Sequence, residues 1–281
     1  MARKLTNQKV VVIGSWVTAL GTIAAAIGST PLRSLKGEDK KRWDYASEQL
    51  DFGGNSFQAI GNIIEVGASD DFKLEEAGEV IQASGNVTVL FSINTKDDEV
   101  KKLRLNVTGN GQQAFGGLLA AIAEFLELVP NGEVPLGIIG NLLQSLGNTL
   151  QAIAALIDLE IIDEKVLIGE YGELEEEDGL SVLEYAIESE EYTISEHIKM
   201  SAQLSELVKY SGSWIQAGGS IISAVSEQRE LARLREMEKE LEKKKNKKRR
   251  KKRKRKNTST STTVNKKNST SAEYSEVRKK S

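Results

Sequence analysis

The sequence predicts an all-α protein in which repeated helical hairpins pack through glycine-faced helices, as a bundle or short array, followed by a charged helix and a disordered tail. Three observations lead to this prediction. A segment with two glycines at a fixed spacing recurs along the chain, which indicates one structural unit used several times. Only 3 of the 281 residues are proline, which favours long helices. The segments between the copies are charged and amphipathic.

The repeated segment carries its second glycine seven residues after the first. Copies start near residues 14, 54, 78, 109, 140 and 212, and a degenerate copy starts near 172, where its acidic interior departs from the pattern. The paired glycines are Gly14, Gly21, Gly54, Gly61, Gly78, Gly85, Gly109, Gly116, Gly140, Gly147, Gly212 and Gly219. They are 12 of the 24 glycines in the chain, so chance placement explains them poorly.

Each copy is predicted to be a helix. Seven residues are nearly two helical turns, so the two glycines of a copy lie on one side. The residue after the first glycine is mostly Asn or Ser, and the residue three further on is Gln or Thr. Because positions three apart are neighbours on a helix, they form a narrow polar seam on a surface that is otherwise apolar or glycine.

Glycine inside a helix costs about 1 kcal/mol relative to alanine, so its repeated use needs a reason. We expect the paired glycines to be helix contact points, where the missing Cβ lets two backbones pack closely. The alternative is that they are turn or C-cap residues that end short helices.

The charged segments between the copies are predicted to be separate, solvent-facing helices that cover the apolar ones. Residues 87–107 also contain short alternating apolar patterns, as at Leu103, Leu105 and Val107. A β-hairpin is therefore an alternative there, although the repeat favours helix.

Long uncharged segments raise the question of a membrane. Residues 10–32, 105–123 and 134–157 approach the length of a membrane span, and the first follows Arg3, Lys4 and Lys9 as in a targeting sequence. The third contains Asn141, Gln144, Asn148 and Gln151, which is too polar for easy insertion. The sequence therefore favours buried helices of a cytoplasmic protein, with membrane association as the alternative.

Three regions are predicted: a helical repeat domain over 1–226, a charged and then basic helix over 227–256, and a disordered tail rich in Ser, Thr and Lys over 257–281. Leu231, Leu234, Met237 and Leu241 form a thin apolar stripe that could pair with another copy as a coiled coil.

Charge is divided unequally between the body and the tail. Residues 243–281 carry 18 Lys and Arg against two Glu, whereas residues 1–242 carry 20 basic and 39 acidic residues. The basic segment 243–256 could bind nucleic acid, an anionic membrane or an acidic protein, or could counter the acidic body. The candidate anion-binding residues are Lys247, Lys248, Arg249, Arg250, Lys251, Lys252, Arg253, Lys254, Arg255 and Lys256.

No catalytic chemistry is predicted. The chain has no cysteine and a single histidine, which leaves little for thiolate or imidazole metal sites. The sequence also lacks the phosphate-binding, dinucleotide, nucleophile-elbow and zinc-protease motifs. We therefore expect no cofactor, no metal, no small-molecule substrate and no enzymatic activity.

The segments GSWVTALGTIAAAIG from residue 14 and GSWIQAGGSIISAV from residue 212 resemble repeats of uncharacterised repetitive proteins of Bacillus-like bacteria, which form a domain of unknown function. The resemblance covers roughly residues 10–226, implies a bacterial source and assigns no activity. The basic tail is not part of that pattern.

The expected function is that of a non-enzymatic structural or interaction protein whose tail recruits an acidic partner or surface. The alternatives are a membrane-associated or membrane-active protein that inserts its glycine-faced helices, and a non-specific nucleic-acid-associated protein acting through residues 243–256.

Overall fold

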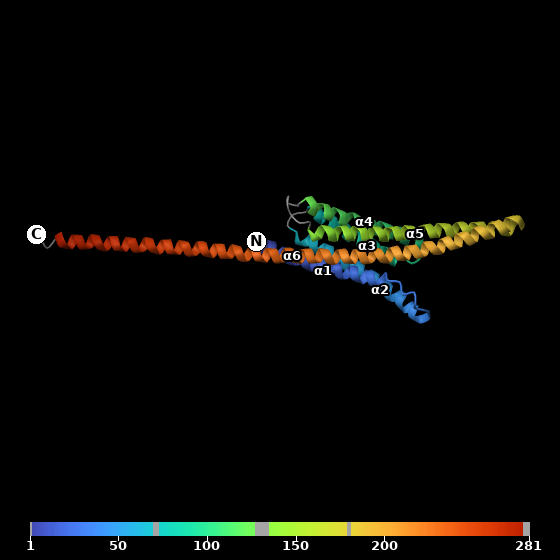
Figure 1. Cartoon of the computed structure of the whole chain (residues 1–281), viewed down its shortest axis with the longest axis horizontal. Coiled ribbons are helices and arrows are strands. Elements are labelled where there is room, and N and C mark those ends of the chain that lie inside the picture. The colour runs from blue at the N-terminus through green and yellow to red at the C-terminus, as the bar shows by residue number, and fades with distance from the viewer. Residues whose placement is uncertain (1, 70–72, 127–134, 179–180, 278–281) are drawn as a thin grey trace. The chain divides into compact units, whose positions relative to one another are not determined.

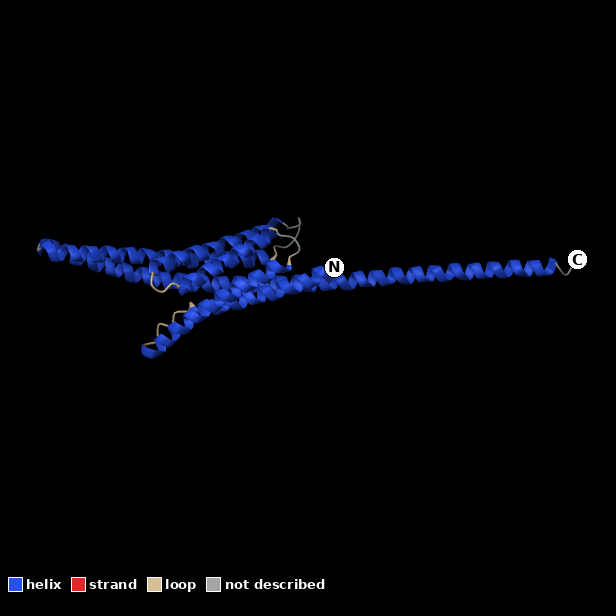
Figure 2. Cartoon of the chain, turned by 180° about the vertical axis from the view of Figure 1, so that it is seen from behind, coloured by secondary structure: helices blue, strands red, loops and turns tan. Residues whose placement is uncertain are grey.

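The computed structural model describes the backbone of residues 2–69, 73–126, 135–178 and 181–277, and the side chains of residues 3–69, 73–126, 135–164 and 195–250. Throughout these residues the chain forms helices and no strand (Figure 2). The helices are α1 (Ala2–Gly28), α2 (Gly37–Ala68), α3 (Leu74–Asn94), α4 (Glu99–Leu126), α5 (Leu136–Asp178) and α6 (Ser181–Val277). The prediction of an all-α protein is confirmed.

The chain divides into two compact units. The larger runs from Thr6 to Leu231 and contains the six glycine-paired copies, and the other joins the residues up to Leu5 with the chain from Ala232 onward. Within the larger unit, α3 packs against both α2 and α4, and α4 packs against α5 (Figure 1). This unit contains both cavities described below.

The segment around residues 87–107 is helical on both sides of a short connection. Helix α3 continues to Asn94 and α4 begins at Glu99, so the β-hairpin alternative is wrong. At the other end of α3, the Lys73 backbone N–H donates to Glu76 Oε2 at 2.8 Å, which is half of a capping box. Acidic residues in the first turns of α2, α3 and α4 further suit the positive ends of the helix dipoles.

The charged segments do not form separate covering helices. Residues 37–51 are the first part of α2, whose later part is the copy that starts at Gly54, and α4 and α6 likewise run from charged into glycine-paired sequence. The separate-helix prediction is wrong because neither proline nor a turn interrupts the helix where the composition changes.

All twelve paired glycines lie inside helices, so the alternative that they end short helices is wrong. In α1 and α2, Gly14 faces Gly61 and Gly21 faces Gly54, and a Cβ on any of the four would lie within 2.8 Å of the opposing glycine's carbonyl oxygen. The same antiparallel arrangement joins α3 to α4 and α5 to α6. The remaining pairs are Gly78 with Gly116, Gly85 with Gly109, Gly140 with Gly219, and Gly147 with Gly212. The degenerate copy near 172 lies outside the residues whose side chains are described.

The interior of the larger unit consists mainly of small and polar side chains, and many large apolar side chains face outward. The most deeply buried large side chains include Asn86 and Asn148, each 1% exposed. Large apolar side chains face outward, with Leu20 61%, Phe91 64% and Phe115 55% exposed. The expectation that apolar faces would be buried against covering helices is therefore wrong: the faces in contact are glycine, alanine and the polar seam.

The C-terminal region is one continuous helix as far as Val277, so the predicted disorder over 257–281 does not match the structure up to that residue. The Ser, Thr and Asn residues of this segment have low helix propensity, and the helix there extends a nucleus already formed upstream. In the predicted apolar stripe, Leu231 and Leu234 are buried, whereas Met237 and Leu241 are exposed.

The adjacent residues Gly53 and Gly54 test the glycine contacts. A Cβ at Gly54 would lie 2.7 Å from the Gly21 carbonyl oxygen, whereas a Cβ at Gly53 would meet nothing within 4 Å. We expect Gly53→Ala to raise the melting temperature, because Ala is favoured over Gly in a helix by about 1 kcal/mol. Gly54→Ala should lower it, because overpacking costs about 1–3 kcal/mol.

Circular dichroism melts of the two variants and the wild type provide the measurement. Equal melting temperatures for Gly53→Ala and Gly54→Ala would show that backbone contact at Gly54 contributes nothing to stability.

Candidate functional site

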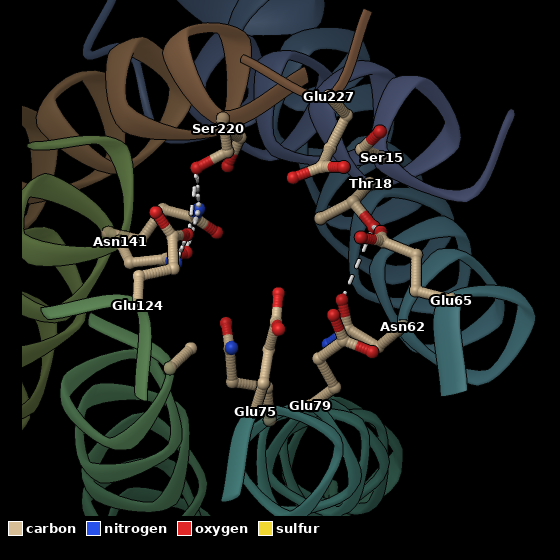
Figure 3. A pocket seen from close by; sticks show the side chains of 14 residues that line it. Ser15, Thr18, Asn62, Glu65, Glu75, Glu79, Glu124, Asn141, Ser220 and Glu227 are labelled. Atoms are coloured by element: carbon tan, nitrogen blue, oxygen red, sulfur yellow. Dashed lines mark hydrogen bonds between the residues drawn. The ribbon is translucent and has the colours of Figure 1, made fainter. Parts of the chain in front are cut away.

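The first cavity, called here the carboxylate cavity, lies at the centre of the larger unit. Side chains from all six helices point into it (Figure 3). Its volume is about 40 Å³, enough for water. It is lined by Ser15, Thr18, Asn62, Glu65, Glu75, Glu79, Gln82, Ala120, Glu124, Asn141, Gln144, Ser220, Ser223 and Glu227. Five of these residues are glutamates and none is Lys or Arg, so the cavity has a strongly negative character when the carboxyls ionise.

Hydrogen bonds tie the wall of the carboxylate cavity together across helices. The Thr18 hydroxyl lies 3.2 Å from Asn62 Oδ1 and 3.4 Å from Glu65 Oε1. On the opposite side, Asn141 Nδ2 donates to Glu124 Oε1 at 3.1 Å. These bonds fix the direction of individual side chains while leaving the centre of the cavity open (Figure 3).

Burial raises the pKa of Glu65 and of Glu79 well above the ordinary value of 4.5. Desolvation is the largest cause for both groups. Repulsion comes next, from Glu227 and then Glu75 on Glu65, and from Glu65 and then Glu75 and Glu76 on Glu79. The hydrogen bond from Thr18 opposes the shift at Glu65.

Glu227 belongs to the same group of carboxyls. Desolvation raises its pKa, and a hydrogen bond from Gln8 Nε2 to Glu227 Oε2, 2.5 Å long, acts in the opposite direction. Three neighbouring carboxyls thus hold their protons at higher pH than free glutamates do.

A second cavity, called here the mixed-charge cavity, has a volume of about 160 Å³. Its ionisable residues are Asp51, Glu99, Lys102, Asp158 and Lys209, so both signs of charge are present. Lys209 Nζ lies 3.6 Å from Asp51 Oδ2. Burial raises the pKa of Asp51 above 3.8, and the charge of Lys209 and its hydrogen bond oppose that shift.

Buried amides bridge the helices at the inner wall of the mixed-charge cavity. Gln216 Nε2 donates to Gln58 Oε1 at 2.8 Å and lies 3.3 Å from Gln113 Oε1. Gln151 Nε2 in turn donates to Gln216 Oε1 at 2.8 Å. Hydrogen bonds among four helices therefore meet at one side chain, Gln216.

Four buried amide atoms have no hydrogen-bond partner among the described residues: Asn86 Oδ1, Gln113 Nε2, Asn148 Nδ2 and Asn148 Oδ1. An unpaired buried polar group costs about 1–3 kcal/mol, so a water or polar ligand beside these atoms would be favourable.

The structure places the predicted contact glycines opposite each other in pairs. The predicted anion-binding residues lie in the basic segment of α6. Lys247, Lys248, Arg249 and Arg250 are exposed on α6, and the side chains of 251–256 lie outside the described residues. The sequence prediction did not include the cavity carboxylates. A signal for one of them was present, because Glu79 takes the seam position that Asn or Ser holds in the other copies.

No group of three or more His, Cys, Asp or Glu side chains within the described part of the chain is arranged to hold a metal ion. The site is therefore a set of carboxyls and amides distributed along a helical bundle.

This fold and interior define a class: a helical bundle with glycine backbone contacts, buried amides and a polar central cavity. A model of a family of unknown function, DUF6944, matches residues 9–174, more than half of the chain, and the chain belongs to that family. The match ends before the last glycine-paired copy. No curated protein and no solved structure matches the chain.

The raised pKa of Glu79 predicts a stability change with pH. Below 4.5 the carboxyl is protonated in both the folded and the unfolded chain, and above the raised folded pKa it is ionised in both. Stability should therefore fall as pH rises between these two values. Glu79→Gln should remove this loss, raising the melting temperature at about pH 8 and leaving it nearly unchanged at about pH 4.

Thermal melts across that pH range measure the effect, with the exposed Glu160→Gln as the control. A Glu79→Gln variant that is less stable than wild type at the higher pH would contradict the assignment of Glu79 as a buried carboxyl that is costly to ionise.

Proposed function

We propose that the chain is a non-enzymatic, membrane-embedded helical bundle, built from three glycine-paired hairpins that enclose a polar interior. The observation that carries this proposal is the distribution of side chains: amides and small residues are buried, and large apolar residues face outward. A lipid environment accepts such an outer surface, whereas water would leave a large apolar surface exposed.

The outer apolar surface is distributed over all six helices. Its members in the uncharged segments include Ile13, Leu20, Phe57, Ile60, Ile63, Phe91, Phe115, Leu142, Leu146 and Leu156, and α6 contributes Trp214. Single exposed apolar residues are normal in soluble proteins, but a surface shared by every helix of a bundle indicates a lipid or protein environment.

The polar residues in the uncharged segment of α5 do not oppose insertion once the structure is considered. Gln144 and Asn148 are buried inside the bundle, 5% and 1% exposed. The same segment presents Ile139, Leu142 and Leu146 outward. Polar side chains in membrane helices face the bundle interior in this way.

Two helical segments, Arg3–Gly28 and Leu136–Glu164, are long and apolar enough to cross a membrane. Only 44% and 28% of their apolar windows are buried, whereas the core helix of a soluble protein would be mostly buried. We propose that the embedded segments are the uncharged parts of the six helices, residues 10–28, 52–64, 80–94, 105–123, 136–157 and 210–226.

In the sequence, the carboxyls of the two cavities come just before or just after these embedded segments. Asp51 and Glu65 flank the segment of α2, Glu79 precedes that of α3, and Glu227 follows that of α6. In space, Glu65 lies beside Gly14, which is inside the embedded segment of α1. The bundle would therefore hold this carboxyl in its polar interior, away from lipid, where an ionised group would be costly. The shortest segments, in α2 and α3, require local thinning of the bilayer.

The basic segment supports a second part of the proposal, binding to anionic lipid headgroups. Residues 243–250 are exposed on one helix, and seven of these eight residues are Lys or Arg. Where Lys and Arg clusters reach the membrane surface, they bind anionic lipid with about 1 kcal/mol per residue.

Fractionation tests the membrane proposal. Cells expressing the full chain are lysed, and the membranes are washed with alkaline carbonate. We expect the protein to stay in the pellet and to float with liposomes after reconstitution, because its outer surface is solvated by lipid. A chain released by the wash and monomeric without detergent would refute membrane embedding. Release of a large homo-oligomer would instead assign the apolar surface to self-association.

The absence of cysteine allows a sharper version of the same test. Phe57→Cys and Gln58→Cys place a spin label at neighbouring positions that are 53% and 3% exposed. In liposomes we expect the label at 57 to be more accessible to oxygen, which partitions into lipid, than to a water-soluble nickel reagent. The label at 58 should show no lipid exposure.

The lipid-binding role of the basic segment is tested by truncation after residue 242. We expect tighter association of the full chain with vesicles containing anionic lipid than with neutral vesicles, a difference that salt weakens. The truncated chain should lose this difference while still inserting. Preference for DNA over anionic vesicles at equal salt would instead support the nucleic-acid role.

A further inference from the structure

We propose that the polar interior is the closed state of a pathway for small monovalent cations, with the carboxylate cavity as one end and the buried amides around Gln216 as the constriction. This inference rests on the proposed membrane function and identifies what the embedded bundle does.

The two cavities occupy successive levels along the same helices. On α2, Asn62 lines the carboxylate cavity and Gln58, one turn earlier, lines the mixed-charge cavity. On α5, Gln144 lines the carboxylate cavity, and Gln151, about two turns later, lines the mixed-charge cavity. Every one of the six helices contributes residues to both cavities. The two cavities therefore lie at successive levels between the same six helices, as a pathway along the bundle requires.

The layer between the cavities contains amide atoms that lack partners. Asn86 lies one turn beyond Gln82 of the carboxylate cavity, and Asn148 lies one turn beyond Gln144. Both are 1% exposed, and three of their amide atoms are unpartnered. Gln113, at the wall of the mixed-charge cavity, leaves Nε2 unpartnered as well. These atoms could form hydrogen bonds with water or a passing ion between the two cavities.

The constriction is held closed by amide hydrogen bonds. Gln216 reaches from α6 to Gln58 on α2, 2.8 Å away, and accepts a hydrogen bond from Gln151 on α5. Rotation of the Gln216 side chain would open this level without moving any helix backbone. Amide oxygens released in this way can replace part of the hydration of a small cation.

Charge at the carboxylate cavity determines the preferred ion. When they ionise, its five glutamates favour cations over anions, because no Lys or Arg lines this cavity. In the mixed-charge cavity, Lys102 and Lys209 are offset by three carboxyls. Monovalent ions fit better than divalent ones, because the described carboxyls do not form a compact chelating group.

The test is potassium flux in liposomes loaded with the full chain, after flotation has shown insertion. We expect little flux for wild type and a roughly tenfold faster flux for Gln216→Ala, because loss of its hydrogen bonds shifts the population towards the open state. Gln58→Ala removes the partner that Gln216 binds on α2, so it should likewise increase potassium flux. Gln112→Ala, next to Gln113 but outside both cavity walls, is the matched control and should behave as wild type.

Ion selectivity is measured on the Gln216→Ala background by comparing potassium with chloride flux. Adding Glu65→Gln and Glu79→Gln should lower the ratio of potassium to chloride permeability at least severalfold, while Glu160→Gln should leave it unchanged. Equal potassium and chloride flux before these substitutions would overturn the cation assignment.

The failure of this inference is distinguishable from failure of the proposed function. Inserted, folded Gln216→Ala and Gln58→Ala proteins that remain as tight to potassium as wild type would overturn the pathway and leave the membrane bundle standing. A chain that does not float with liposomes would overturn both.

Discussion

The close approach of helix backbones at the paired glycines is the constraint on which the rest of the structure depends. Where Gly21 and Gly54 meet, a single added carbon would lie within 3 Å of backbone atoms. Helices held this close leave little space between them, and at the contact positions most of the residues are glycine, alanine or serine. Alanine, serine and the slender amides fill the interior, and the bulky apolar residues are directed outward. The glycine contacts therefore limit the size of the interior side chains, but they do not by themselves require those side chains to be polar.

A polar interior of this kind is stable only if its amides find partners. Gln216 shows how this is achieved, since it links side chains from α2, α4 and α5 in one network. Such a network is favourable when every member is satisfied and costly when it is not. The unpartnered atoms of Asn86 and Asn148 therefore mark the level where the protein alone does not complete its own hydrogen bonding.

The sequence predicted the helical class and the residues at which helices meet, because a seven-residue glycine spacing has one simple meaning on an α-helix. It did not predict which face of each helix is buried inside the bundle. The rule that apolar residues are buried holds for a protein in water, and the copies carry both an apolar face and a small polar face.

The helix boundaries were also misjudged. The composition changes from charged to uncharged at Asp51, but no helix-breaking residue follows, so α2 continues. The carboxylate cavity was missed because Glu65, Glu79 and Glu227 come from three helices that only the fold brings together.

A bundle with a purely structural role would have no need of this interior. Apolar residues of similar volume in place of the buried amides would keep the glycine contacts and remove the unpartnered atoms, and such replacements are often neutral or stabilising. Yet each of the six copies places Thr or Gln at the same seam position, from Thr18 to Gln216, and the structure buries all six. The polar character of the interior is therefore retained at some cost to stability. If the outer surface contacts lipid as proposed, such an interior would hold water or ions where the bilayer excludes them.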